Sequence, residues 1–493
     1  MKKIILICLV FASIGLHAQS FLGVHTSNYD PLKTGLFNPA SPATSLMKWE
    51  VSLVGFEVHA AQNYLKLKGG IKEWASDFDK DVNVVENLNG EDKTGNVTFD
   101  IPTLGFVFNN AKVGAIYLSN RSRVIVDAQG IKEEFISSMY NDPNNIYNWA
   151  NEISDSKLSL NAHAFSEISF GYSRYVLSKE KHALSAGATV KLLVPGFSGK
   201  VNGDVDITID EAAETANFGT TDISAISSSE LNAIDDDNYS KSFKIGGVGF
   251  DLGAVYEWKT GQGTTKIVGK NKNKVKIQPD YFLKAGFAVL DIGKIKYEHS
   301  VYSREFFGDG TTVALADITQ SDSSFQDFDD VLNAVGSYNE FTGDFKTKLP
   351  TALSMFLDAK LTRGIYVNAS AIINLGKFSD GTPKARTQSI YSITPRFELP
   401  MVGVQIPMAY NTINGFEMGT SFRFSQFVIG SSNIFSYLWS KETSSIDIQF
   451  AMAFGGVNKD KKKEVKQLID DEEMLLQDNT EEPAKTKKSK KNK

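Results

Sequence analysis

Four charged residues lie on stretches of sequence that otherwise alternate between apolar and small or polar side chains: Asp251, Glu257, Glu298 and Arg423. Their chemistry is electrostatic, because carboxylates and a guanidinium form salt bridges or attract a charged solute. If these stretches cross a membrane as strands, a basic side chain that faces lipid at mid-membrane costs about 2 to 4 kcal/mol. We therefore expect the four charges to face a barrel lumen. There they would fill the interior as a salt-bridged network, which we favour, or line a path for polar solute.

Histidine and serine are the residues that would carry catalysis. The histidines beyond the first 20 residues show neither metal-ligand spacing nor a nucleophile elbow; they are His25, His59, His163, His182 and His299. His163 beside a serine of the neighbouring strand, such as Ser185, would make a general-base pair. Barrel histidines without such a role are far commoner, so we expect no enzyme, no cofactor and no metal site.

Residues 201–240 are acidic, with ten Asp and Glu and neither Lys nor Arg. Asp235, Asp236 and Asp237 could offer oxygens to Ca²⁺. However, three consecutive side chains cannot all turn inward, and the spacing is not that of a calcium loop. We favour a solvated acidic loop. Divalent cations that bridge this loop to a lipopolysaccharide surface are the alternative.

The elements that must position the charged residues are strands. Residues 445–454 read S-I-D-I-Q-F-A-M-A-F, in which every second residue from Ile446 to Phe454 is apolar. The same period of two recurs at 184–192, 250–258, 351–361, 365–373 and 414–424. Strands with one apolar and one polar face, without an apolar run long enough for a membrane helix, are typical of a transmembrane β-barrel. The mean hydropathy of -0.20 agrees, because only half of each strand would face lipid.

The N-terminus predicts export. Lys2 and Lys3 precede an apolar run, and Ala18 offers a cleavage point, so residues 1–18 are expected to be a signal peptide. The only cysteine, Cys8, lies within it. The formal charge of -6 and the absence of basic patches with interleaved aromatic residues argue against nucleic acid as a partner.

Short and long links alternate along the chain. Short turns are expected at 109–110, 178–181, 361–364 and around Ser425, and long links at about 69–96, 127–157, 200–242, 308–343 and 376–410. This alternation is typical of outer-membrane barrels. Counting 281–307 as one strand gives about twelve strands, whereas splitting it at 291–294 and adding a hairpin gives about fourteen. An even count would leave both ends of the mature chain in the periplasm.

The regions flanking the predicted barrel (residues 48–454) differ from it in character. Residues 19–47 contain Asn38, Pro39 and Ala40 and a second proline, Pro42, which prevent regular ladder pairing. We expect this segment to be a plug or hatch, with a simple periplasmic lead-in as the alternative. Residues 455–493 are rich in lysine and acidic residues. They are expected to form a partly disordered periplasmic tail, or a tether to cell-wall polymer or a partner complex.

Several segments resemble known families. The stretches at 20–29 (S-F-L-G-V-H-T-S-N-Y), 38–40 (N-P-A), 247–258 (G-V-G-F-D-L-G-A-V-Y-E-W) and 291–297 (D-I-G-K-I-K-Y) resemble an uncharacterised family of Bacteroidetes outer-membrane barrels. In addition, G-L-F-N-P-A at 35–40 looks like the signature near the N-terminus of the long-chain fatty-acid transporter family. The first resemblance implies an outer-membrane barrel and leaves its activity open.

The second resemblance implies fourteen strands, an N-terminal hatch, and passive movement of hydrophobic molecules through a side opening. It covers only Asn38, Pro39 and Ala40 residue by residue. On this basis Asn38 would cap a turn of the hatch and Pro39 would stiffen its backbone. A related barrel of the same superfamily is a shuttle for proteins secreted by the type IX system, which implies a different class of function.

The resulting prediction is an all-β transmembrane outer-membrane barrel of about 12–14 antiparallel strands with an N-terminal plug-like segment. Its expected function is passive transport or binding of hydrophobic small molecules. The alternative is a structural or secretion-accessory barrel without transport activity. Expected partners are outer-membrane lipid, a hydrophobic small molecule, and a periplasmic or secretion-system protein.

Overall fold

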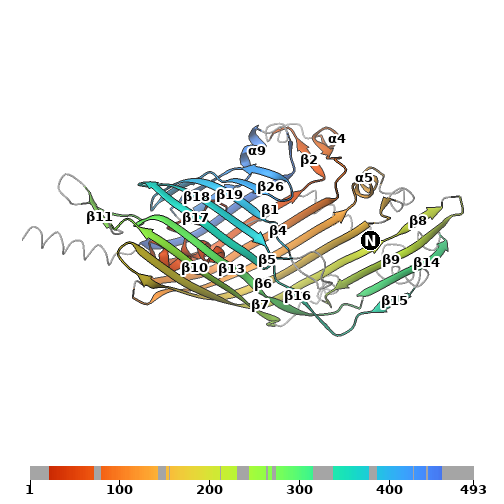
Figure 1. Ribbon diagram of the computed structural model, residues 1–493, viewed down its shortest axis with the longest axis horizontal. Coiled ribbons are helices and arrows are strands. Elements are labelled where there is room, and N and C mark those ends of the chain that lie inside the picture. The colour runs from red at the N-terminus through yellow and green to blue at the C-terminus, as the bar shows by residue number, and fades with distance from the viewer. Residues whose placement is uncertain are drawn as a thin grey trace, which may run out of the picture.

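The fold is an all-β barrel, seen in a computed structural model (Figure 1). The structure describes residues 22–70, 79–110, 112–142, 152–154, 156–210, 212–229, 244–261, 265–268, 274–301, 303–314, 337–376, 386–425, 427–439 and 442–457. Within these residues, antiparallel strands form a closed barrel of 14 strands. The prediction of a barrel with 12–14 strands is confirmed at its upper value.

Strand β1 closes the ring, because it pairs with β4 on one side and with β26 on the other. In order around the ring the strands are β1 (Met47–Gln62), β4 (Lys93–Asn110), β5 (Gly114–Ile131), β6 (Ser156–Ser178), β7 (His182–Val205), β10 (Gly247–Lys259), β13 (Tyr281–Glu298), β16 (Asp344–Lys348) with β17 (Ala352–Thr362), β18 (Ile365–Asn374), β19 (Ile390–Glu398), β20 (Val402–Gln405) with β21 (Met408–Asn411), β22 (Gly415–Met418) with β23 (Thr420–Phe424), β24 (Phe427–Ser431) and β26 (Ser445–Val457).

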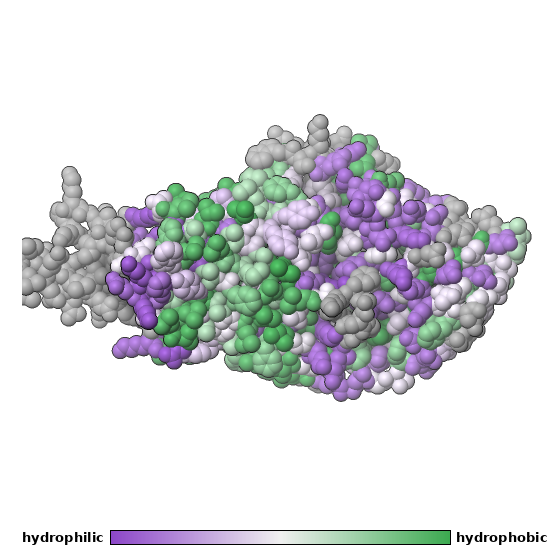
Figure 2. Space-filling model, viewed as in Figure 1, coloured by the Kyte–Doolittle hydropathy of each residue, from purple (hydrophilic) through white to green (hydrophobic). Residues whose placement is uncertain are grey.

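The alternation in the sequence matches the two faces of the wall. In β26, Ser445, Asp447 and Gln449 are buried, whereas Ile448 and Phe454 are 46% and 40% exposed. The same pattern leaves apolar side chains on the outside of most strands, as on a lipid-facing belt. Figure 2 shows this apolar surface over the region of β10 and β13, with hydrophilic surface toward β9 and β14.

The two ends of the barrel differ. Residues 179–181, 363–364 and 399–401 make tight connections at one end, which we call the short-turn end. Strand β1 begins and β26 ends there, since Met47 pairs with Val457. The opposite end, which we call the long-link end, carries most of the longer connections and their secondary structure.

Several predicted links contain strands, which the period-two pattern did not reveal. The predicted link 376–410 holds β19, β20 and the start of β21, and the predicted acidic loop 201–240 holds the end of β7 and two further strands. The additional elements are α2 (Pro31–Phe37), η1 (Ser41–Thr44), β2 (Leu65–Lys68), α4 (Lys80–Asn83), β3 (Val84–Glu86), α5 (Glu133–Asn141), β8 (Ile207–Asp210), β9 (Thr215–Ser227), β11 (Thr265–Val268), β12 (Lys274–Ile277), β14 (Arg304–Ala314), β15 (Ser337–Glu340), α9 (Ile434–Trp439) and β25 (Glu442–Thr443).

Strands β8, β9, β14 and β15 extend beyond the ring at the long-link end (Figure 1). No helix in the described part of the chain is long and apolar enough to cross a membrane. The predicted signal peptide (1–18) and the aspartates at 235–237 lie outside the described residues, as does the predicted tail apart from 455–457, which belong to β26.

Candidate functional site

The N-terminal segment (residues 22–46) lies inside the barrel near the short-turn end. It contacts inward-facing groups from strands on different sides of the ring. The carbonyl oxygen of Leu22 accepts hydrogen bonds from Ser421 and Gln449, and Ala43 donates its backbone N–H to the Ser173 hydroxyl at 3.1 Å. Most of the segment is buried. An axial path through this end of the barrel therefore meets protein.

The Asn-Pro-Ala motif of this segment is seated against the wall. The Asn38 side-chain amide donates hydrogen bonds to the carbonyl oxygens of Ala254 (3.1 Å) and Phe287 (3.2 Å). Its side-chain oxygen accepts from the Ala40 N–H at 2.9 Å, which closes a local turn. Asn38 thus caps a turn and also holds the segment to β10 and β13.

Two glycines make room for the motif. Gly187 on β7 and Gly253 on β10 are directly opposite each other in the sheet. A Cβ atom on Gly187 would lie 2.1 Å from the Pro39 carbonyl oxygen, and one on Gly253 would lie 2.4 Å from the Asn38 side-chain oxygen. We call this pair the glycine socket. The close approach of the motif to the sheet explains why both positions are glycine.

A first ionic cluster holds the beginning of the segment. Arg396 on β19 contacts Asp358 at 2.9 Å and donates to the Thr26 hydroxyl at 2.6 Å. Glu398 accepts hydrogen bonds from the backbone and side chain of Asn28. All five groups are buried. Buried charges need such partners, because an isolated ion in a low-dielectric interior is strongly unfavourable.

A second ionic cluster lies farther from the short-turn end. Lys191 on β7 contacts Asp251 at 2.9 Å and also Asp291, and Arg123 on β5 contacts Asp291 at 2.6 Å. Arg123 and Asp291 come from strands that are not neighbours in the ring, so this contact crosses the lumen. The cluster ties opposite walls together and fills the space between them.

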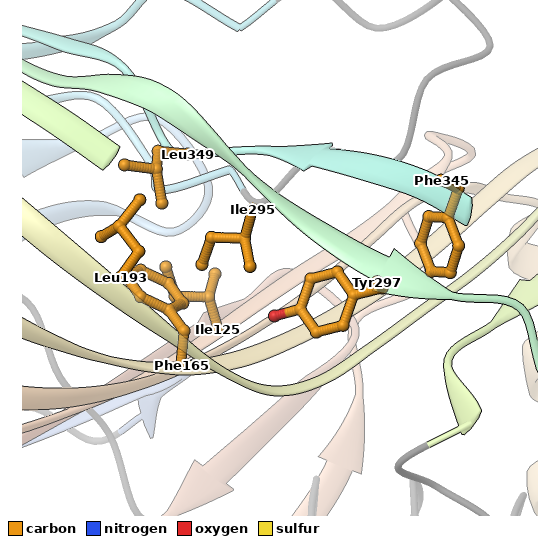
Figure 3. Packing of buried hydrophobic residues seen from close by; sticks show 7 residues of the cluster. All are labelled: Ile125, Phe165, Leu193, Ile295, Tyr297, Phe345 and Leu349. Atoms are coloured by element: carbon orange, nitrogen blue, oxygen red, sulfur yellow. The ribbon is translucent and has the colours of Figure 1, made fainter. Parts of the chain in front are cut away.

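An apolar cluster lies immediately beyond the second ionic cluster, in the direction of the long-link end. Its members are at most 9% exposed and come from β5, β6, β7, β13, β16 and the residue that follows β16. Figure 3 shows how their side chains gather. They are Ile125, Phe165, Leu193, Ile295, Tyr297, Phe345 and Leu349. Apolar side chains that face a barrel lumen depart from the usual polar interior.

The order of these layers follows from β7. Gly187 lies against the Asn-Pro-Ala motif, Lys191 belongs to the second ionic cluster, and Leu193 belongs to the apolar cluster. Along the lumen from the long-link end, the apolar cluster thus precedes the second ionic cluster, and the buried Asp127–Arg386 ion pair lies farther out still. The N-terminal segment would be the last barrier.

A section of the barrel wall beside β26 is not built from paired strands. Strand β24 pairs with β26 only from Phe427 to Gly430, so the stretch of β26 from Ser445 to Ile448 has a strand partner on the β1 side alone. Residues 432–437, including part of α9, occupy the other side. Asp447 donates its backbone N–H to the Tyr437 hydroxyl at 2.7 Å. Side-chain contacts close the wall here, in place of a continuous ladder.

A family profile matches residues 39–432, and it describes a family of unknown function, DUF5723. The chain belongs to this family. The resemblance to an uncharacterised family is thereby confirmed, although the family carries no activity to transfer. No curated protein matches this member of DUF5723.

Solved structures with a similar arrangement include a FadL homologue from Pseudomonas aeruginosa and the toluene transporter TodX from Pseudomonas putida. The FadL homologue is 12% identical to this chain. The matched region covers 88% of this chain and 93% of the homologue, with a TM-score of 0.39. TodX is 9% identical to this chain. The matched region covers 90% of this chain and 99% of TodX, with a TM-score of 0.38.

The charges predicted in the lumen do not all lie there. Asp251 and Arg423 are buried among ionic partners, and Glu257 is buried where it accepts a hydrogen bond from Tyr175 at 2.7 Å. Glu298 is exposed on the outside of β13, so its predicted placement is wrong. The reason is a bulge at Leu290 and Asp291, two consecutive buried residues that together oppose one residue of β10.

The residues weighed for catalysis have other partners. His163 lies 2.9 Å from the Tyr297 hydroxyl, while the Ser185 hydroxyl donates to the Ala40 carbonyl oxygen at 3.2 Å. In the described residues, no group of three or more His, Cys, Asp or Glu could hold a metal ion.

Sequence reasoning missed most members of the two ionic clusters. Lys191 lies inside a strand whose alternation was recognised, and Arg396 and Glu398 lie two residues apart on β19. One sequence signal could have identified Lys191: it is a charged residue at a lumen-facing position of a strand whose alternation was recognised. The sequence pattern predicts a link over residues 376–410, and this prediction hid Arg396 and Glu398.

Proposed function

We propose that this DUF5723 member is an outer-membrane barrel that binds hydrophobic small molecules and passes them across the membrane passively. The exposed apolar belt and the closed ring support a membrane location. We place the long-link end outside the cell and both ends of the mature chain in the periplasm. Outer-membrane lipid is then the surrounding partner.

The observation that carries this proposal is the apolar cluster inside an otherwise charged lumen. Small-molecule sites are lined mainly by hydrophobic and aromatic side chains, with a few polar groups that fix orientation. Phe165, Tyr297 and Phe345 supply aromatic surface, and the Tyr297 hydroxyl and His163 supply polar contacts. A hydrophobic ligand would replace the packing that these side chains now make with one another.

The exit is proposed to be lateral. The N-terminal segment and the two ionic clusters occupy the axial route, and charged groups give an apolar molecule no favourable contacts. The wall section at α9 depends on side-chain hydrogen bonds, which open at lower cost than a continuous ladder of backbone bonds. A molecule leaving here would enter the membrane on the long-link side without passing Asn38 and Arg396.

A matched pair of phenylalanines on one strand tests the binding step. Phe165 on β6 faces the apolar cluster, and Phe170 on the same strand is 53% exposed toward lipid. Displacement of a fluorescent apolar probe from the purified full chain would be titrated with a long-chain fatty acid and with toluene, and with glucose as polar reference. For Phe165→Ala we expect the affinity for the apolar ligand to fall at least about fivefold, which is about 1 kcal/mol.

Phe170→Ala should leave that affinity unchanged, because its side chain is on the other face of the wall. Equal affinities in both variants, or no saturable binding of either apolar ligand, would contradict the proposal. A protein without saturable ligand binding would instead fit the structural or secretion-accessory alternative. Protein partners, in place of small molecules, would then need to be sought.

A further inference from the structure

Residues 386–389, which lead into β19 at the long-link end, lie inside the barrel. We call these four residues the strap. Arg386 and Gln388 are each 5% exposed, and Thr387 and Ser389 are half-buried, although the strap forms neither helix nor strand. A buried segment without regular structure must find partners for its backbone polar groups. Those partners show where the strap lies.

Two consecutive carbonyl oxygens of the strap are held by opposite walls. The Arg386 carbonyl oxygen accepts a hydrogen bond from the Asn96 side chain of β4 at 2.9 Å. The next carbonyl oxygen, that of Thr387, accepts one from the Asn374 side chain of β18 at 2.6 Å. Strands β4 and β18 face each other across the ring, with six strands between them in either direction. The strap therefore crosses the lumen from wall to wall.

The side chains of the strap reach β1 and β5, the two strands that flank β4. Arg386 makes an ion pair with Asp127 of β5, Nη2 to Oδ2 at 3.3 Å, and donates a hydrogen bond to the Gln129 side-chain oxygen at 3.0 Å. The Gln388 amide donates to the His59 imidazole of β1 at 2.6 Å. The strap is thus anchored on β18 at one side and on three adjacent strands at the other.

The strap lies directly outside the apolar cluster. Ile125 belongs to that cluster, and Asp127, which holds Arg386, is two residues farther toward the long-link end on β5. Two residues of a strand span about 7 Å. On its other side the cluster meets the second ionic cluster, since Leu193 and Lys191 are two residues apart on β7. Polar groups therefore cover the apolar cluster at both ends.

The contacts that hold the strap are polar, although apolar contacts could be equally stable. Replacing a buried ion pair by apolar side chains is often neutral or stabilising. Apolar side chains would oppose opening, because lifting them exposes apolar surface to water at about 25 cal/mol per Å². Polar groups at the outer mouth are solvated again when they separate. Such contacts, on a segment without a strand ladder, are suited to reversible opening.

We propose that the strap is an outer gate of the apolar cluster, closed by the Arg386–Asp127 ion pair, which lifts to admit a ligand and closes again over it. The inference rests on the proposed function, because the site behind the gate is the proposed ligand site. The same ion pair closes the strap over the empty and the occupied site. Weakening it should therefore speed entry and exit equally and leave the affinity unchanged.

A test that needs no ligand uses a thiol placed in the apolar cluster. The only cysteine of the chain, Cys8, lies in the predicted signal peptide, so Leu193→Cys supplies the thiol to be labelled. Its rate of reaction with N-ethylmaleimide in the purified, folded chain reports opening of the strap. The strap variant is Asp127→Asn with Arg386→Gln, which leaves neither charge of the pair buried alone.

The matched control is Lys157→Gln with Asp204→Asn, which removes an exposed ion pair of β6 and β7 at the same end of the barrel. In the strap variant we expect the thiol to react at least about tenfold faster than with the wild-type strap, a change within the range of coupling energies between contacting residues. The control should react at the wild-type rate, and Arg386→Lys, which keeps a cation, more slowly than the strap variant. Equal rates in the strap variant and the control would overturn the proposal.

Stopped-flow binding of the fluorescent apolar probe separates the gate from the site behind it. In the strap variant, association and dissociation should both be about tenfold faster, with the affinity unchanged within about twofold. A changed affinity at an unchanged association rate would overturn the gate, because the strap would then be part of the ligand site. Faster thiol reaction without saturable probe binding would support the strap as the outer closure and contradict the proposed function instead.

Discussion

Gly253 on β10 lies opposite Gly187 on β7, and the Asn38–Pro39 peptide occupies the space that a side chain on either glycine would need. The Asn-Pro-Ala motif and this glycine socket are therefore complementary parts of one contact. The contact lies on the inner face of the wall, where the Pro39 carbonyl oxygen would be 2.1 Å from a Cβ atom on Gly187. The contact explains why the chain combines the Asn-Pro-Ala motif, which lies outside the strands, with glycine at positions 187 and 253 within them.

Filling the glycine socket should displace the N-terminal segment. For Gly253→Ala, the new Cβ would clash with the Asn38 side chain, and we expect a loss of about 1 to 3 kcal/mol of stability. Limited proteolysis within residues 22–46 should become faster. Gly95→Ala on β4 is the control, because its nearest neighbour atom would lie 3.6 Å away. If the two variants are equally resistant to proteolysis, the socket does not hold the segment.

Arg396 should be the most sensitive charge in the first ionic cluster. Its removal in Arg396→Met leaves Asp358 and Glu398 buried without their shared cation, which costs about 3 to 5 kcal/mol. Arg363→Met changes an exposed arginine of the short-turn end and should cost less than about 0.5 kcal/mol. The heat-modifiability of the folded barrel on gels measures the loss of stability in each of the two variants. A similar small effect in the two variants would show that the cluster contributes little.

The filled lumen predicts very low ion conductance. We expect no discrete single-channel steps from the wild-type chain in planar bilayers, and none from Asp251→Asn, since Asp251 is buried against Lys191. Asp204→Asn on an exposed part of β7 serves as the matched charge control. Stable conductance that changes only in Asp251→Asn would mean that this residue lines an open aqueous pore.

His25 predicts a loss of stability in mild acid. Burial, aided by the nearby Arg396 guanidinium, lowers the pKa of His25 to about 4, although the Asp358 carboxylate acts in the opposite direction. The pKa of an unfolded histidine is about 6.5, so between about pH 6.5 and pH 4 the unfolded chain binds a proton at His25 more readily than the folded chain does. The folded state is therefore favoured most above about pH 6.5. This contribution is lost as the pH falls from about 6.5 to about 4.

The corresponding variant is His25→Phe, which keeps a ring beside Phe37. Its melting temperature should fall less than that of wild type between pH 7 and pH 4. His182→Phe, at an exposed position of the short-turn end, should follow the wild-type curve. Identical acid sensitivity in wild type and His25→Phe would exclude His25 as a source of the pH dependence.

The contact between α9 and β26 should control opening of the wall. Tyr437→Phe removes the hydroxyl that accepts a hydrogen bond from the Asp447 N–H, a loss of about 1 kcal/mol. We expect faster hydrogen exchange at residues 432–439 and faster exchange of bound apolar ligand. Tyr172→Phe removes a hydroxyl that donates to Val113 on the short-turn side and should change neither rate. If Tyr437→Phe also changes neither, ligand leaves by another route.

The barrel could be predicted from the sequence because each lipid-facing strand keeps its period of two, as Ile446 to Phe454 do. The outward placement of Glu298 could not, since the sequence marks residues 291–294 only as a possible break between strands, whereas a bulge at Asp291 keeps one strand and reverses its phase. Strand β19 was hidden because Pro395 interrupts its outward apolar face, which otherwise consists of Tyr391, Ile393 and Phe397. The partners of Asn38 and of Lys191 depend on contacts between distant parts of the chain, which periodicity cannot specify.

Binding of an apolar ligand is tested most directly by native mass spectrometry of the chain purified from outer membranes in mild detergent. We predict a bound apolar small molecule in wild type and in Phe170→Ala, and its loss or reduced occupancy in Phe165→Ala. A stoichiometric protein partner without any bound small molecule would contradict the transport proposal and favour the accessory alternative.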